Sequence, residues 1–314
     1  MTDELYRDMN GWKWYRIGEH ASFQAEKLLH SKPELQRWYE RINGRSSNYM
    51  GLRTHAGEQN ALFGSIVVLR DKETLEQRSI THYYLTGSFL VTIGWDTNVL
   101  CRTSEQELTA KLDGCRTPLD GFFLLIGEAL DSYMEGMDQF EEKLMRVESE
   151  MRQNNGIRVL DHIMECRYEL LRWAALTLPM REILAAAKEV FMEEVEEAVE
   201  YKRTRLRADR IVMLEKQYEH EVETLLKMDD GIGSVRGNEI MKTLTVFTAV
   251  FTPVMALGAL WGMNFEKMPE LEWPWGYAAA LVLILAGTVA VYWYLYLKGW
   301  TGDLLKHKRN KSVR

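Results

Sequence analysis

The segment Gly262-Met263-Asn264 lies in a short loop between two apolar runs near the C-terminal end of the chain. Each run is long enough to cross a membrane, so the three residues would lie where a membrane-spanning helix gives way to a loop. That placement predicts a membrane protein whose chemistry lies at the helix–loop junction.

Two segments would position this junction. The first extends from about Ile240 to Trp261 and would form a helix of roughly 33 Å, enough for a hydrocarbon core of about 30 Å. The second, from about Trp275 to Leu297, is just as long. It is rich in Ala, Leu, Val and aromatic residues and has no acidic residue, which suits an outer, lipid-facing layer.

The charges around the spans predict their orientation. The loop between the spans is mostly acidic, and a cationic tail follows the second span. The positive-inside rule therefore places the tail in the cytoplasm and the loop outside. With two spans, the large N-terminal part must be cytoplasmic as well. The cations are Lys298, Lys306, Lys308, Arg309, Lys311 and Arg314.

The first span has two different faces. On a helical wheel, hydroxyl, thioether and small side chains lie within about 40° of one line, opposite bulky apolar ones. Such a line suits close helix packing, with the threonines bonding their own backbone, or the wall of a narrow path, and the wheel leaves both interpretations open. Two spans of one chain cannot enclose a pore, so a pore requires a ring of identical chains. The line comprises Met241, Thr248, Thr252, Met255 and Ala259, flanked by Leu244 and Thr245.

The stretch from Asn238 to Trp275 resembles the signature of the CorA-type magnesium transporters, a two-span family with a Gly-Met-Asn motif. It contains NE-x-MK-x-LT, a proline in mid-span, GMNF and MPEL, and a second span follows. This combination is highly specific, whereas GMN alone would be a weak signal. The resemblance covers roughly the last 75 residues, and the part before them is similar only in architecture.

The resemblance implies a homopentamer whose first span lines a cation pore, with Asn264 forming a ring at the outer mouth. Its neutral amide oxygens would accept hydrogen bonds from the water of Mg²⁺, a small ion that dehydrates reluctantly. Gly262 would allow the tight turn out of the helix, with Met263 packing behind it. Acidic loop residues would raise the local cation concentration at the entrance. These are Glu266, Glu270 and Glu272.

The pore wall is carried over by position and supported by the wheel. Thr252 and Met255 stand where the family often has methionine before the proline and threonine after it, so the constriction is not assigned. The wall residues are Asn238, Met241, Leu244, Thr245, Thr248, Thr252, Met255 and Ala259.

The composition leaves room for a large soluble part. Of the 314 residues, 27% are charged and the formal net charge is −7. About 235 residues remain outside the spans, enough for one large or two small domains. Cys101, Cys115 and Cys166 have no metal-ligand or disulfide spacing, which fits a reducing compartment. Met1 to His20 is polar and mixed in charge, so we expect no secretory signal.

Residues 1–118 predict a mixed α/β domain. A helix is expected around Phe23 to Ile42, followed by three strands, of which the last two form a hairpin through Thr86-Gly87. The region has no nucleophile, metal or nucleotide signature, so we assign it no catalytic role and do not expect an enzyme. The predicted strands are Ala61 to Leu69, Ser79 to Leu85 and Ser88 to Ile93.

Two long helices should follow as a helical hairpin, from Pro118 to about Asn154 and from Ile157 to about Phe191. His162 and Cys166 lie four residues apart on the second, near Glu165 and Glu169, and could hold a soft metal. We favour packing.

A dense acidic run then precedes a dense basic run. Such blocks are usually solvated faces, although here they could also pair between subunits or help to sense cations. The runs are Glu193, Glu194, Glu196, Glu197 and Glu200, then Lys202, Arg203, Arg205, Arg207 and Arg210.

From about Thr204, apolar residues near a 3.5-residue spacing predict a coiled-coil stalk that leads into the first span. Glycines at 231, 233 and 237 interrupt it, each weakening a helix by roughly 1 kcal/mol relative to alanine. We interpret Gly231 and Gly233 as a candidate hinge at the inner mouth, and Asp229 and Asp230 as a candidate acidic ring. The stalk seam comprises Ile211, Leu214, Tyr218, Val222, Leu225 and Met228.

The predicted fold class is an α+β membrane protein with a cytoplasmic α/β domain, a long helical stalk or coiled coil, and two C-terminal transmembrane helices. The expected parts are the α/β domain (1–118), the long-helix funnel and stalk (119–238), the first span (239–261), the extracytoplasmic loop (262–274), the second span (275–297) and a basic cytoplasmic tail (298–314).

We predict a homopentameric divalent-cation channel or transporter of the inner (plasma) membrane that takes up Mg²⁺, with Co²⁺ or Ni²⁺ as further ions. Both termini would be cytoplasmic, and its partners would be further copies, the lipid bilayer and the ion, with no cofactor and no nucleic acid. Two alternatives stay open: a Zn²⁺ transporter of the same two-span superfamily, and a non-conducting membrane-anchored scaffold. GMN and MPEL, as opposed to the GVN or GIN of zinc members, favour magnesium.

Overall fold

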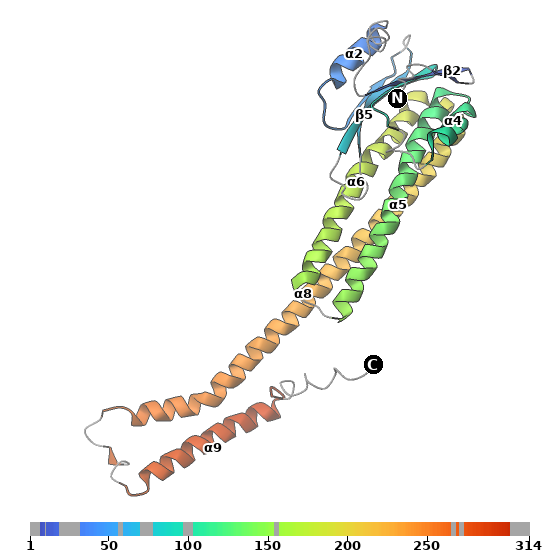
Figure 1. The fold of residues 1–314 in the computed structure, drawn as a ribbon. Coiled ribbons are helices and arrows are strands. Elements are labelled where there is room, and N and C mark those ends of the chain that lie inside the picture. The colour runs from blue at the N-terminus through green and yellow to red at the C-terminus, as the bar shows by residue number, and fades with distance from the viewer. Residues whose placement is uncertain are drawn as a thin grey trace. The chain divides into compact units, whose positions relative to one another are not determined.

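The computed structural model describes residues 7–9, 11–18, 32–55, 59–69, 78–96, 103–153, 157–264, 268–269 and 273–301. The chain divides into two compact units, Met1–Leu226 and Lys227–Arg314. Figure 1 shows the sheet and long helices in the first unit, and the end of one of these helices with a further helix in the second.

A six-stranded sheet with the order β1-β2-β6-β5-β4-β3 begins the first unit. β2 pairs with β6 in parallel, and the other neighbouring strands pair antiparallel. The three predicted strands are confirmed as β4, β5 and β6, and the hairpin turn is fixed by the Thr86 hydroxyl, which accepts the N–H groups of Ser88 and Phe89. The strands are β1 (Arg7–Met9), β2 (Trp12–Ile17), β3 (Tyr49–Arg53), β4 (Ala61–Leu69), β5 (Arg78–Thr86) and β6 (Phe89–Ile93).

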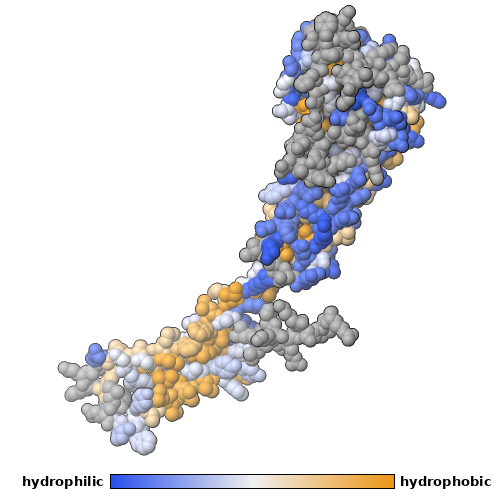
Figure 2. Space-filling view, in the orientation of Figure 1, coloured by the Kyte–Doolittle hydropathy of each residue, from blue (hydrophilic) through white to orange (hydrophobic). Residues whose placement is uncertain are grey.

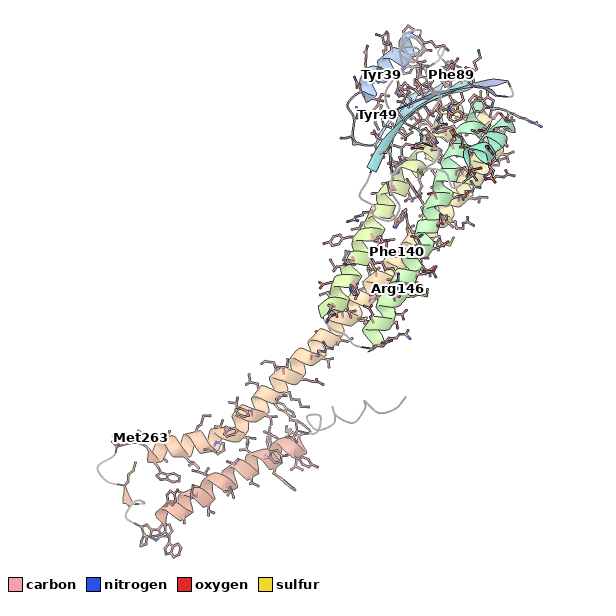
Figure 3. The ribbon with its side chains drawn as sticks, in the orientation of Figure 1. Tyr39, Tyr49, Phe89, Phe140, Arg146 and Met263 are labelled. Carbon is pink, nitrogen blue, oxygen red and sulfur yellow. The ribbon has the colours of Figure 1, made fainter. Side chains whose placement is uncertain are left out.

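Helix α2 (Pro33–Ile42) covers one face of the sheet, and it is the described part of the helix expected from Phe23 to Ile42. Its Leu35, Trp38 and Ile42 are buried against an aromatic cluster of the sheet, at the end of the molecule where Figure 3 labels Tyr39, Tyr49 and Phe89. The long helices cover the opposite face, where the Tyr83 and Phe122 rings lie 5.1 Å apart.

The helical part starts with α4 (Glu105–Asp113), whose N-terminus has a capping box formed by Ser104 and Glu107. The predicted hairpin is confirmed as α5 (Pro118–Gln153) and α6 (Ile157–Phe191). A short α7 (Glu193–Glu197) then leads into α8 (Val199–Trp261).

The first part of α8 packs against α5 and α6 through polar side chains placed inside an apolar interface. The Thr204 hydroxyl donates to the Phe123 carbonyl at 2.7 Å, and the Thr177 hydroxyl donates to Glu215 at 2.6 Å. The predicted coiled-coil seam is largely buried within this chain, with Ile211, Tyr218, Val222 and Leu225 among the buried residues. Met228 is 55% exposed, so the packed part of the seam ends near the boundary of the first unit.

Helix α8 runs through the glycines at 231, 233 and 237 over all its 63 residues, so the expected continuous helix into the first span is confirmed and the glycines weaken it without breaking it. Three glycines cost roughly 3 kcal/mol together. Once a helix is nucleated, each further residue adds a hydrogen bond, so an established helix on both sides can offset that cost.

The second unit contains the end of α8 and helix α9 (Gly276–Leu297), which matches the second predicted span. Both helices are long and apolar enough to cross a membrane. Figure 2 shows hydrophobic side chains over much of the visible surface of these two helices. Only 6% of the most apolar stretch of each helix is buried. A core helix of a soluble protein would be mostly buried, so these are not core helices.

Candidate functional site

The three-residue motif follows directly on the end of α8. The Gly262 N–H donates to the Gly258 carbonyl at 2.9 Å and closes the last turn. A Cβ at Gly262 would lie 3.0 Å from that oxygen, so glycine permits the close approach. Met263, labelled in Figure 3, is half exposed, and Asn264 is exposed beside it. The Asn264 amide is therefore available for hydrogen bonds to water or to an ion's hydration shell.

Helix α9 covers one face of the apolar part of α8. Val246 is buried there, and a Cβ at Gly287 of α9 would lie 3.4 Å from Cβ of Pro253. Ala249, Val250 and Leu257 are partly buried on the same side of α8. The mid-span proline therefore faces the second span, which approaches closely because Gly287 has no side chain.

The predicted wall lies along a different face of α8, at about 70° to 170° from the line through Val246 and Pro253 on the wheel. All of its residues are exposed: Asn238, Met241, Leu244, Thr245, Thr248, Thr252, Met255 and Ala259. Met241, Leu244 and Met255 are 61%, 57% and 58% exposed. Among the described residues of this chain, nothing buries this face.

The threonine hydroxyls on this face bond their own helix. Thr245, Thr248 and Thr252 each donate to the carbonyl four residues earlier, at 2.8 Å. This agrees with one half of the packing interpretation, the backbone bonding. No helix in the described part of this chain packs on this face, so helix-on-helix packing here would involve another copy.

Bulky apolar side chains form a third face of the same helix. The Phe247 and Phe251 rings lie 4.6 Å apart, and both side chains are exposed, as are Ile240 and Val254. The bulky back expected from the wheel is therefore divided between the α9 contact and a free face. A free aromatic and aliphatic face suits lipid or a neighbouring copy.

The remaining predicted site residues belong to the loop after the motif and to the part of α8 before the span. The loop carboxylates Glu266, Glu270 and Glu272 lie outside the described residues. Asp229 and Asp230 lie on the uninterrupted α8, partly and fully exposed. A Cβ at Gly231 or Gly233 would meet nothing within 4 Å.

The soft-metal alternative on α6 receives no support. Cys166 is fully buried, and burial raises the pKa of its thiol to about 11, so the metal-binding thiolate is disfavoured. His162 Nδ1 instead lies 2.8 Å from Oε2 of Glu150 on α5. In the part of the chain that the structure describes, no group of three His, Cys, Asp or Glu residues is arranged to hold a metal.

The acidic run lies on α7 and the first turn of α8, the basic run lies on α8, and each makes ion pairs within the chain. Lys188 of α6 lies 2.7 Å from Glu196, and Arg203 lies 2.6 Å from Glu200. These side chains are largely exposed apart from Glu200, as expected for a solvated face, so the pairs add little stability.

A charge network that the sequence did not predict joins α4, α5 and α8. The buried Glu128 carboxylate accepts bonds from Lys111 at 2.6 Å and from the Thr103 hydroxyl at 2.8 Å. Asp131 pairs with Arg207 at 3.2 Å, and burial raises its pKa against the opposing effect of that guanidinium. The carboxylates on α5 recur at helical spacing, which was a signal for one face, but their partners lie on other helices.

Known proteins share the sequence pattern and the fold of this chain. The family described as "CorA-like Mg2+ transporter protein" matches residues 11–299. The "Magnesium transport protein CorA" of Bacillus subtilis (strain 168) is 37% identical over 303 residues, covering 96% of this chain and 95% of that protein.

Two solved structures share the fold. The complete CorA magnesium transporter from Methanocaldococcus jannaschii aligns with a TM-score of 0.70 at 16% identity, over 95% of this chain and 94% of that one. The ZntB cytoplasmic domain from Vibrio parahaemolyticus aligns with a TM-score of 0.55 at 11% identity, over 73% of this chain and 89% of that one. At these identities, the likeness concerns the fold alone.

Proposed function

The chain belongs to the family of CorA-like Mg2+ transporter proteins, and on that premise we propose that it carries Mg²⁺ across a membrane as a ring of identical copies. As a member of a transporter family, it is not an enzyme. The observation that carries the proposal is the uncovered face of α8, which ends at the exposed Asn264.

That face is the part of the second unit that we expect other copies of the chain to cover. It carries the hydroxyl groups of Thr245, Thr248 and Thr252 in a mostly apolar span, and α9 lies against a different side of the helix. Polar groups at membrane depth usually face a protein interior or a water-filled cavity. A homopentamer with α8 innermost and α9 outermost, as the resemblance implies, provides such a cavity.

Asn264 is the proposed selectivity element, with Gly262 and Met263 forming the turn that presents it. A ring of neutral amide oxygens would hold the hydrated ion without stripping its water, which Mg²⁺ releases reluctantly. Two positive charges moving inward through about 100 mV gain roughly 4.6 kcal/mol, so uptake needs no further energy source.

We further propose that the loop after α8 faces outward and that both termini are cytoplasmic, because the cationic tail favours the inner side. Glu266, Glu270 and Glu272 would then concentrate cations at the entrance. Asp229 and Asp230 would form the inner acidic ring, and Gly231 and Gly233 the hinge beside it.

Flux into lipid vesicles tests the proposal. Full-length protein is reconstituted, and entry of Mg²⁺, Zn²⁺ and Co²⁺ is followed side by side, with and without a pH gradient. We expect Mg²⁺ flux without a gradient. Asn264→Ala should lower it about tenfold or more, because the ring loses its oxygens, whereas Asn264→Gln should retain more of it because the amide remains.

The alternatives give different results in the same assay. Faster entry of Zn²⁺ than of Mg²⁺, or entry that depends on the pH gradient, would replace magnesium by zinc as the cargo. No flux of any ion from the wild-type protein, with a cellular phenotype that survives Asn264→Ala, would support the scaffold instead.

A further inference from the structure

The register of α8 against α9 brings two lysines to the same level. Figure 1 shows α9 returning beside the end of α8, and a Cβ at Gly287 would lie 3.4 Å from Cβ of Pro253. Lys242 precedes Pro253 by 11 residues, and Lys298 follows Gly287 by 11 residues. Because the helices run in opposite directions, both steps lead about 16.5 Å toward the same end of the pair. The two lysines therefore lie at one level on neighbouring helices.

The same spacing places both lysines on the contact between the helices. Eleven residues make three full turns and about 20°, so Lys242 lies nearly on the side of Pro253, and Lys298 nearly on the side of Gly287. Burial agrees with this placement. The partly or fully buried positions recur on α8 at 242, 246, 250, 253 and 257, and on α9 at 284, 287, 291 and 295, a series that 298 continues.

A tight turn ends α9 directly at Lys298. Gly299 has a φ of +73°, which favours glycine. The N–H groups of Gly299 and Trp300 donate to the carbonyls of Tyr296 and Leu295, each at 3.0 Å. These two bonds form a Schellman motif, which stops a helix by reversing the chain. The Lys298 ammonium therefore lies at the end of the apolar stretch and not within it.

Exposed aromatic side chains surround this end of α9. The Lys298 Nζ lies 5.7 Å from the centre of the Tyr294 ring. Tryptophan and tyrosine at the end of a span lie preferentially at the level of the lipid headgroups. At the opposite end of the pair, the described residues 258–264 and 273–277 include no lysine or arginine. Cations and aromatic rings thus occur together at one end, where the exposed rings are Trp293, Tyr294, Tyr296 and Trp300.

We propose that Lys242 and Lys298 bind the phosphate of an anionic phospholipid headgroup between α8 and α9. Each ammonium group brings a positive charge and N–H donors, and the phosphate of the lipid brings a negative charge and acceptor oxygens. A lipid suits the place better than a free anion, because the aromatic and apolar surface of α9 lies beside the lysines and can contact its glycerol and acyl parts. The exposed Glu239, one turn before Lys242, lowers the net charge here, so both lysines are needed.

This inference goes beyond the proposed function and requires only that both helices cross a membrane. In the proposed orientation the bound lipid belongs to the cytoplasmic leaflet. The cationic tail, which lies outside the described residues after 301, would add attraction to the same anionic surface. A lipid held by both lysines would link the end of α9 to α8 at the point where α8 enters the membrane.

Lipid binding tests the site without reference to ion flux. Full-length protein in mild detergent is titrated with phosphatidylglycerol, and bound lipid is counted by native mass spectrometry, with phosphatidylcholine as the neutral comparison. Lys242→Gln with Lys298→Gln should weaken phosphatidylglycerol binding about tenfold or more and leave phosphatidylcholine binding unchanged. Lys242→Arg with Lys298→Arg keeps both charges and should stay within about threefold of wild type.

The matched control removes two positive charges from the same helix away from the contact. Lys227 and Arg236 lie on α8 at about 80° and 100° from the direction of Pro253. Lys227→Gln with Arg236→Gln should weaken phosphatidylglycerol binding less than about twofold. A loss equal to that of the Lys242 and Lys298 variant would assign the effect to net charge and refute the site.

The other outcomes are equally decisive. Equal binding of phosphatidylcholine by wild type, or displacement of the lipid by inorganic phosphate, would overturn an anionic-lipid site. If the double glutamine variant does not assemble, Lys298→Gln alone takes its place, and a change below about twofold refutes the site. Flux assays on the same samples keep the two proposals apart. Wild type that conducts Mg²⁺ but binds no phosphatidylglycerol refutes the lipid site alone, and wild type that binds the lipid but conducts no ion refutes the proposed function alone.

Discussion

The two units of this chain solve the problem of burying apolar surface in opposite ways. In the first unit, large side chains such as Trp38, Trp173 and Phe122 are almost fully buried, and the buried Thr204 hydroxyl has a carbonyl partner. In the described part of the second unit, Val246 and Leu295 are the buried hydrophobic residues, whereas many large apolar side chains are exposed.

The difference shows what each unit needs from its surroundings. Burial of apolar side chains within the chain stabilises the first unit in water. The described part of the second unit encloses almost no core, so its apolar surface suits lipid and, in the proposed ring, further copies of the chain. Sequence hydropathy reports the same contrast, but only the structure shows which face of α8 is already covered.

The glycines of the two units differ in the same way as their apolar side chains. A Cβ at Gly121 or Gly136 of α5 would lie 2.2 Å from the Trp12 or Trp173 ring, so no side chain fits there. A Cβ at Gly231, Gly233 or Gly258 of α8 would meet nothing within 4 Å of this chain. The first glycines are required by packing within the chain, and the second are not.

Gly136→Ala should have the largest effect on stability. The added methyl group would overlap a buried indole ring, and overpacking should lower the free energy of unfolding by about 2 kcal/mol. Unfolding of the purified full-length protein in detergent, followed by tryptophan fluorescence, measures this change. A variant as stable as wild type would show that the first unit repacks easily, which would weaken the contrast between the units.

Gly231→Ala with Gly233→Ala should have the opposite sign. Each change should favour the helix by roughly 1 kcal/mol, because alanine restricts the unfolded chain and clashes with nothing. If the segment is a hinge, stiffening it should alter ion flux or its regulation in vesicles. Unchanged flux and regulation would count against the hinge, and a loss of stability would mean that another copy packs closely against these glycines.

The sequence predicted the long helices of both units more fully than the strands of the first unit. The two spans and the α5–α6 hairpin were predicted within a few residues, because long apolar or amphipathic periods are a strong local signal. Strands β1, β2 and β3 were not predicted. They are short, and β2 joins the sheet beside β6, which is far away in the sequence. The Trp14 side chain of β2 donates a hydrogen bond to the Thr92 hydroxyl of β6, 78 positions later.

The candidate site was predictable in part. The motif and the line of wall residues came from sequence, and the structure leaves that line exposed on one face of α8. The contact of Pro253 with Gly287, and the use of the threonine protons, depend on packing and rotamers that no sequence period reports. The network around Glu128 was missed because its partners come from separate helices.

Glu215→Gln should give the smallest effect and confine it to the first unit. Burial raises the pKa of this carboxyl above its usual value of 4.5, against the hydrogen bond from Thr177 and the charge of Arg181. The folded state therefore keeps its proton where the unfolded chain has lost it, and stability falls as pH rises through this range. The variant should melt slightly higher than wild type at pH 7, with the difference vanishing below pH 4.5.

Glu219→Gln is the control, because it removes the same charge from an exposed position one turn away. Its charge adds the smallest contribution to the raised pKa of Glu215, so Glu219→Gln should change the melting temperature and its pH dependence much less than Glu215→Gln does. A rise equal to that of Glu215→Gln would assign the effect to net charge and not to burial.

The length of α8 also sets the order of events during synthesis. The Phe123 carbonyl accepts a hydrogen bond from the Thr204 hydroxyl, which is synthesised 81 positions later. At about 5–20 residues per second, the 63 residues of α8 take roughly 3–13 s to translate. The helix that completes the bundle is thus followed at once by the apolar span. A ribosome that stalls between the two would leave a finished soluble part with no anchor, and one that runs on would deliver a span before its bundle has closed.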